Sequence, residues 1–253
     1  MLARVRFRNR LRVAIACAVT AWCASDIDIA RGADDEEEVP LPFHGPDVHP
    51  GYPDAFHVGF VLLSSALSPD KRYGIIYPRR FIGDTAGDFV VDVPGSRVLA
   101  SVAADEPYFV GKNHGSIGFH WAPDSSAVLV ENGGKWAPRN LLLIELKDGI
   151  VARQTDLLDA LDRLFSPAIA KAEHTRARDA SVDELSITDV RWKNGRGAQV
   201  EIACEGGTNP KGFAEQSAWS GKLVAIWDVA QRKFVQQKVT QTSFRKAGRE
   251  EDE

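Results

Sequence analysis

The chain has 253 residues, of which 31 are Lys or Arg and 35 are Asp or Glu, so its formal net charge at pH 7 is −4. This acidic balance opposes binding to nucleic acid and to anionic lipid, because both partners are polyanions. Once the terminal segments described below are set aside, about 190 residues remain, which is enough for one domain with its own core.

The first 25 residues are typical of an export signal. Five arginines lie between Arg4 and Arg12, no acid occurs before residue 26, and an apolar stretch runs from Val13 to Ala24. The stretch is short for a bilayer span, and Cys23-Ala24-Ser25 offers small residues for cleavage. We therefore expect a secreted or periplasmic protein, without stable membrane insertion after signal removal, whose net charge shifts from −4 to −9 with the loss of those five arginines. A membrane anchor is the alternative.

Residues 26–54 are predicted to form a linker and an extended arm. An acidic run from Asp34 to Glu38 precedes a proline-rich stretch, a composition typical of solvated, extended chain. The spacing of His44, His49 and His57 fits no helix or turn that would bring three imidazoles onto one zinc ion. We expect no metal site and no cofactor. Residues 243–253 are predicted to be a charged, disordered tail.

A pattern of four β-prone runs occurs three times within residues 55–242, the predicted β-repeat domain. The runs are residues 57–63, 73–77, 89–93 and 98–102; residues 116–121, 127–130, 142–146 and 150–152; and residues 187–192, 198–202, 224–229 and 234–239. Pro69-Asp70, Pro123-Asp124 and Asn194-Gly195 form turns between the first and second runs, because proline presets φ and Asn-Gly tolerates positive φ. The alternation of apolar and polar residues predicts a mainly β fold of three four-stranded antiparallel meanders.

These features resemble the PD40/WD40-like β-propeller repeat of TolB-type exported proteins. The likeness is carried by Ser68-Pro69-Asp70, by Trp121-Ala122-Pro123-Asp124-Ser125-Ser126, and by an acidic residue near the end of each third run: Asp92, Glu145 and Asp228. It covers most of residues 55–241, but the glycine usual after Pro-Asp is missing and the third unit lacks Pro-Asp. Closed propellers have about four to eight blades, so the resemblance implies propeller-like meanders in an open arc or partial propeller. An ordinary β-meander domain is one alternative, and a homodimer that joins two arcs into a ring is another.

A helical insertion is predicted near residues 156–178, between the second and third units. Apolar residues recur on one helix face, at Leu157, Leu158, Leu161, Leu164 and Phe165. Ser166-Pro167 matches an N-cap followed by proline at the first helical position, which predicts a second helix over residues 167–178. We expect the insertion to cover an exposed sheet face.

The long connections are expected to share one end of the strands. In an up-and-down meander, the connections between second and third runs lie at the same end as those between units, and here both kinds are long. The predicted ligand-binding residues in and around these connections are Lys112, Asn113, His114, Trp136, Arg139, Asn209, Lys211 and Trp219. Aromatic rings beside cations and amides suit a polar organic ligand such as a glycan or peptide. Solvated loops without a function are the alternative.

The sequence contains no specific catalytic signature. Ser68-Pro69-Asp70-Lys71 has the Ser-x-x-Lys spacing, but it lies at a strand turn, and residues 206–212 lack P-loop spacing and are predicted to form a flexible turn. His114 is the best candidate for a general base, because imidazole titrates near neutrality. His120 is expected to be structural, and Cys204 a small buried strand residue.

The sequence therefore predicts an exported, non-enzymatic binding module that uses its long-loop face. Its partner would be a protein, peptide or glycan, and not nucleic acid. Two alternatives remain at this point. The protein is a hydrolase or lyase with its site in the same loops, or it is a structural subunit that pairs through open sheet edges.

Overall fold

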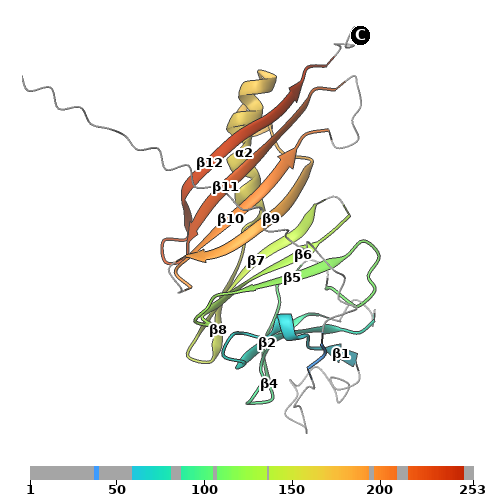
Figure 1. The fold of residues 1–253 in the computed structure, drawn as a ribbon, viewed down its shortest axis with the longest axis vertical. Coiled ribbons are helices and arrows are strands. Elements are labelled where there is room, and N and C mark those ends of the chain that lie inside the picture. The colour runs from blue at the N-terminus through green and yellow to red at the C-terminus, as the bar shows by residue number, and fades with distance from the viewer. Residues whose placement is uncertain are drawn as a thin grey trace, which may run out of the picture. The chain divides into compact units, whose positions relative to one another are not determined.

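The structure is a computed structural model that describes residues 37–39, 59–80, 87–104, 107–135, 137–193, 197–209 and 216–247. The predicted export signal, most of the predicted arm, and residues 248–253 lie outside these residues. The described chain forms three four-stranded antiparallel sheets and one α-helix (Figure 1), so the predicted mainly β fold of three meanders is confirmed. Within the same residues, no helix has the length and apolar character needed to span a membrane.

Each sheet is a meander in which consecutive strands pair. The first contains β1 (Phe60–Val61), β2 (Tyr73–Pro78), β3 (Phe89–Asp92) and β4 (Arg97–Ser101), with the short 3-10 helix η2 (Ser64–Ala66) after β1. The second contains β5 (Ser116–Trp121), β6 (Ala127–Gly133), β7 (Pro138–Lys147) and β8 (Ile150–Asp156). The third contains β9 (Glu184–Lys193), β10 (Gln199–Gly207), β11 (Ala218–Asp228) and β12 (Lys233–Arg245).

The second sheet is buried on both faces. Along β6, Val128 and Val130 join a core cluster with Ile75 and Val90 of the first sheet. The intervening Leu129 faces the opposite way, into a cluster with the third sheet and the helix. Side chains alternate between the two faces of a strand, so a nearly continuous apolar run in β6 can bind the sheets on both sides together.

The second and third units each donate a tryptophan hydrogen bond to the unit before them. Nε1 of Trp121 donates to the carbonyl oxygen of Ala66 at 3.2 Å, and Nε1 of Trp192 donates to the carbonyl oxygen of His120 at 2.9 Å. Both tryptophans are the last or next-to-last residue of the first long strand of their unit. The repetition in the sequence therefore corresponds to a repeated hydrogen bond between units, each contributing about 1 kcal/mol.

The turns after these strands also connect neighbouring units. The backbone amide of Asp70 donates to Oγ of Ser125 at 3.2 Å, and the amide of Gly197 donates to Oδ2 of Asp124 at 3.1 Å. The position after each Pro-Asp, where glycine was expected from the resemblance to the PD40/WD40-like repeat, is occupied by Lys71 with φ 58° and by Ser125 with φ 60°. The missing glycine thus leaves two L-residues in the left-handed region, which is costly for side chains of this kind.

The helix α2 (Leu158–Glu173) contradicts the predicted break at Ser166-Pro167, because it continues through Pro167 as one helix. Proline removes one backbone hydrogen bond at this point. Phe165 on one side of it and Ile169 on the other are both fully buried in the same core cluster, and this burial favours the unbroken helix. A short 3-10 helix, η3 (Ala177–Asp179), completes the insertion, so its predicted extent near residues 156–178 is confirmed.

The helix covers one face of the third sheet, as predicted. It packs against β11, β12 and β7 (Figure 1). Phe165 meets the indole of Trp219 edge-on, with the ring centroids 5.8 Å apart. Cys204, on β10, is buried in the same cluster, as the sequence predicted, and burial raises the pKa of its thiol to about 12.

Both predicted boundaries of the β domain are too narrow. Residues 37–39, assigned to a solvated linker, run antiparallel to the segment after β1: the amide of Val39 donates to the carbonyl oxygen of Leu62 at 2.8 Å, and Glu38 forms an ion pair with Arg79. At the other end, β12 continues to Arg245, beyond the predicted limit at residue 242, because Phe244 packs on the core around α2. In both places an apolar residue, Val39 or Phe244, packs on a core cluster and lies in a stretch that the sequence assigned to solvent.

Candidate functional site

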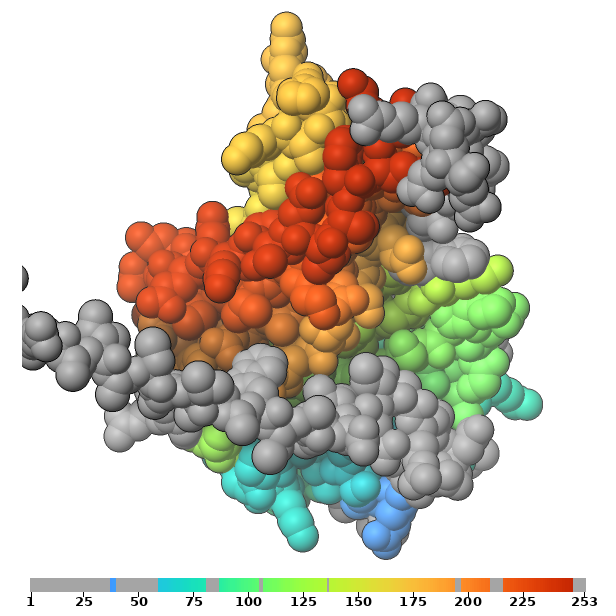
Figure 2. All heavy atoms as spheres, turned by 45° about the horizontal axis from the view of Figure 1, so that its top comes forward, coloured from blue at the N-terminus to red at the C-terminus, as the bar shows by residue number. Residues whose placement is uncertain are grey.

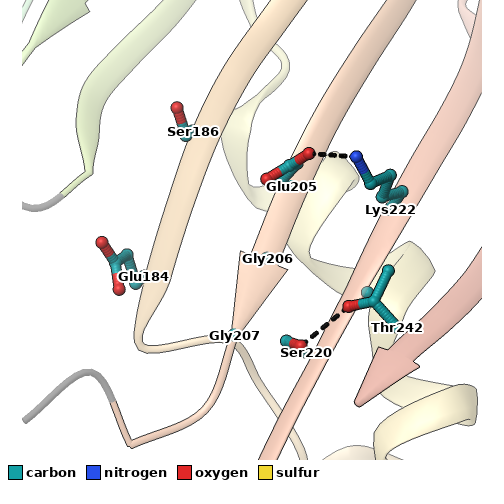
Figure 3. A pocket seen from close by; sticks show the side chains of 9 residues that line it. Glu184, Ser186, Glu205, Gly206, Gly207, Ser220, Lys222 and Thr242 are labelled. Carbon is teal, nitrogen blue, oxygen red and sulfur yellow. Dashed lines mark hydrogen bonds and ion pairs between the residues drawn. The ribbon is translucent and has the colours of Figure 1, made fainter.

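A shallow depression of about 250 Å³ lies on the third sheet (Figure 3). Its lining comes from the beginnings of β9 and β11 and the ends of β10 and β12: Glu184, Ser186, Glu205, Gly206, Gly207, Ser220, Gly221, Lys222 and Thr242. Those strand ends share one end of the sheet, where the connection between β10 and β11 also lies. The depression is therefore at the end of the strands that the long connections were expected to elaborate.

The exposed side chains of this region stand on the sheet face opposite α2. Figure 3 shows the helix behind the strands, with Glu205, Lys222 and Thr242 on the viewer's side. In the space-filling view, β11 and β12 form a continuous exposed surface beside the helix (Figure 2). The alternation of buried and exposed residues along β10 and β11 agrees with this arrangement.

Glycines line the depression, and one of them leaves room for a core side chain beneath it. A Cβ at Gly221 would stand 2.3 Å from Cη2 of Trp219, so the indole occupies that space on the helix side. A Cβ at Gly207 would meet only the carbonyl oxygen of Trp219, at 3.5 Å, so this position leaves room for a side chain. The predicted flexible turn starting at residue 206 is wrong at this point, because Gly206 and Gly207 are the last residues of β10, paired with Gly221 and Ser220.

The polar groups of the depression are partly satisfied by one another. Nζ of Lys222 lies 2.6 Å from Oε1 of Glu205 in an exposed ion pair, and Oγ of Ser220 lies 2.8 Å from Oγ1 of Thr242. The side chain of Glu184 makes no hydrogen bond or ion pair with the residues that the structure describes. An exposed ion pair contributes at most about 1 kcal/mol, so a ligand can rearrange these groups at small cost.

The predicted residues Lys112, Asn113 and His114 lie together in the connection between the first and second sheets. Nζ of Lys112 donates to the carbonyl oxygen of Pro107 at 2.9 Å, and its ammonium lies 5.9 Å from the ring centroid of Phe109. His114 is exposed and has φ 56°. The side chain of Lys112 therefore contacts residues of its own loop.

Of the other predicted residues, the structure describes Arg139, Asn209 and Trp219. Arg139 lies on β7 and is half-buried, while Trp136 and Lys211 are outside the described residues. Asn209 is buried, and its backbone amide donates to Oδ2 of Asp183 at 2.8 Å. Trp219, predicted to face a ligand, is only 1% exposed and donates from Nε1 to Gln241 at 3.2 Å. The indole ring of Trp219 packs in the core beneath the depression, because Gly221 has no side chain to fill that space.

One unusual group was missed by sequence reasoning. Asp88, just before β3, is 2% exposed; its Oδ2 accepts a hydrogen bond from the amide of Tyr108 at 3.1 Å, and Oδ1 has no partner among the described residues. Burial raises the pKa of Asp88 to about 7, although the Tyr108 amide and the charge of Lys112 oppose the shift. Burial correspondingly lowers the pKa of Lys112, against the attraction of Asp88. An acid directly before an apolar strand was the available signal.

Two further titratable groups are half-buried within the sheets. Burial lowers the pKa of His120, against the attraction of Asp189, and the backbone oxygen of His120 receives the indole N–H of Trp192, in agreement with a structural role. Burial also raises the pKa of Glu131, on β6, to about 7. In the part of the chain that the structure describes, no group of three His, Cys, Asp or Glu side chains is placed to hold a metal ion.

No protein-family model matches the chain, and the search of curated proteins also finds no match.

Proposed function

We propose that this protein is an exported, non-enzymatic binding module whose binding site is the depression at the loop end of the third sheet. The observation that carries the proposal is the position of this depression: it opens on an exposed sheet face, at the end of the strands where the long connections lie. Rigid strands that present polar groups beside a long connection are a common arrangement for ligand recognition.

The chemistry of the lining favours binding over catalysis. The groups are two carboxylates, one ammonium and three hydroxyls, from Glu184, Glu205, Lys222, Ser186, Ser220 and Thr242. Such groups donate and accept hydrogen bonds with a polar ligand. The hydroxyl of Ser220 is bonded to the hydroxyls of Thr242 and Ser243, and not to a base that would activate it as a nucleophile. The ammonium of Lys222 is held in an ion pair with Glu205.

The proposal is tested by filling the depression. Gly207→Val adds a β-branched side chain at an outward position with room for it. Ala203→Val is the matched control, because Ala203 lies on the same strand and face but outside the lining. We expect the secreted protein to bind members of a glycan and peptide array, the Gly207 variant to lose this binding, and the control to keep it. Equal binding by all three proteins would overturn the site.

A hydrolase or lyase is the second candidate, and Asp88 is the observation that favours it. A buried carboxyl whose pKa is near 7 can exchange a proton at neutral pH, and Lys112 of the same loop as His114 is close enough to influence it. Assaying the wild type, Asp88→Asn and His114→Ala against ester, glycoside and phosphate substrates tests this. Turnover by the wild type that both variants lose would establish an enzyme and displace the binding proposal.

We also infer export and a relation to propeller repeats. The arginine-rich, then apolar N-terminus supports export. The hydrogen bonds that Trp121 and Trp192 each donate to the preceding unit support a repeat of the PD40/WD40-like kind. N-terminal sequencing of secreted protein should give a start near residue 26, and a start at Met1 in the membrane fraction would instead indicate an anchor.

A further inference from the structure

We propose that the depression on the third sheet receives the basic side chain, Arg or Lys, of an extended polypeptide, with Glu184 as the carboxylate that pairs with it. This inference rests on the proposed binding function and adds the class of partner. It follows from the charges on this sheet face, from the hydroxyls around Glu184, and from the side-chain types in the lining.

Six charged residues on the outward face of the third sheet form three ion pairs, while Lys238, on β12 outside the lining, forms none with the residues that the structure describes. Nε of Arg191 lies 2.7 Å from Oδ2 of Asp189, and Nζ of Lys193 lies 2.8 Å from Oε2 of Glu201. Nζ of Lys222 lies 2.6 Å from Oε1 of Glu205. Glu184 has no such partner among the described residues, so the described lining of the depression carries one uncompensated negative charge. A cationic group is attracted to this end of the face, and an anionic ligand is repelled from it.

The neighbours of Glu184 complete the hydrogen bonding that a guanidinium or ammonium needs. Such a group carries several N–H donors and no acceptor, so its partners must offer oxygens. Oγ of Ser186 follows two residues along β9, on the same side of the strand, and Gly207 lies opposite Glu184 in the register without a side chain in the way. Figure 3 shows Glu184 and Ser186 along the same border of the depression, on the side of β9 away from Glu205.

The lining favours a polypeptide over a sugar. An aromatic ring that could stack on a pyranose is absent from the described lining, because the nearby Trp219 is packed on the helix side of the sheet. The depression is open and shallow, which fits one side chain of a segment laid across the sheet, with the rest of the segment contacting the exposed face.

The test is an NMR titration of isotopically labelled protein with three acetylated, amidated pentapeptides, Gly-Ser-X-Ser-Gly, in which X is Arg, Gln or Glu. We expect the Arg peptide to shift the amide signals of Gly207, Ser220 and Lys222, and the other two to have much weaker effects. Glu184→Gln should lower the affinity for the Arg peptide by about threefold, the effect of one exposed ion pair.

Glu201→Gln is the matched control. It removes the same charge from the same sheet face outside the depression, so the affinity should stay within about 1.5-fold of wild type, the scatter expected for a distant surface charge. Equal weakening by both variants would overturn the assignment to Glu184.

The two proposals fail in different ways. Shifts of the same amides by a glucosamine oligomer or by the Glu peptide, but not by the Arg peptide, would overturn the basic partner and leave the binding site standing. If no probe shifts these amide signals and Gly207→Val does not change binding to the array, both the binding site and its basic partner are overturned.

Discussion

Replacing Asp88 by Asn should stabilise the protein increasingly as the pH rises. The carboxyl is buried, one of its oxygens has no partner among the described residues, and its pKa is raised from the ordinary 3.8 to about 7. Between these two values the unfolded chain releases a proton that the folded chain keeps. The stability that Asp88 contributes is therefore fully present below about pH 4 and is lost as the pH rises through 7. Asn has nearly the same shape and does not titrate.

The size of the effect follows from the pKa shift. A shift of about three units corresponds to about 4 kcal/mol over the whole titration, at 1.36 kcal/mol per unit. Between pH 4.5 and pH 8 the expected loss is about 3 kcal/mol. Over that interval the free energy of unfolding of the variant should rise by this amount relative to the wild type. Glu131 titrates in the same range in both proteins, so its contribution cancels in the difference.

Urea unfolding at pH 4.5, 6 and 8 measures this difference, because the free energy of unfolding extrapolates linearly in urea. Asp70→Asn is the control. Burial is the largest single influence on the pKa of Asp70 and raises it, but hydrogen bonds with Ser68, Arg72 and Ser125 together outweigh burial and lower the pKa below 3.8. Its contribution is thus lost only in stronger acid, and the control difference should be flat over this interval. A flat difference for Asp88→Asn as well would refute the reasoning from burial.

Three further predictions concern the fold. Lys71→Gly should raise the free energy of unfolding by about 0.5–1 kcal/mol in thermal or urea denaturation, because glycine adopts φ 58° without strain; a loss of stability would show that the lysine is not strained there. Trp192→Phe should lower it by about 1–2 kcal/mol, since the carbonyl oxygen of His120 loses its indole donor, and an unchanged stability would rule out that bond as a tie between units. Phe165→Ala should cost about 3–5 kcal/mol through a cavity against Trp219, while the exposed Arg163→Ala should cost less than about 0.5; similar costs would contradict the packing of α2.

The candidate site was only partly predictable. Its end of the strands followed from the order of long and short connections, but its residues did not. Trp219 was expected at a surface because an aromatic residue followed a polar loop. Whether its indole turns toward the helix depends on Gly221, which lies two residues away and leaves the space that the ring fills. Gly207 was assigned to a flexible turn, and only its pairing with Ser220 makes it the floor of a depression.

Local chemistry determined the strands and turns of this protein. Alternating apolar residues and turns such as Pro69-Asp70 act within a few residues, so the twelve strands that the structure describes could be placed from the sequence. The unbroken helix through Pro167, the hydrogen bonds of Trp121 and Trp192, and the buried state of Asp88 were decided by tertiary structure. Each depends on groups far apart along the chain that come together only when the sheets pack, and the free energy of that packing exceeds the local preference it overrides.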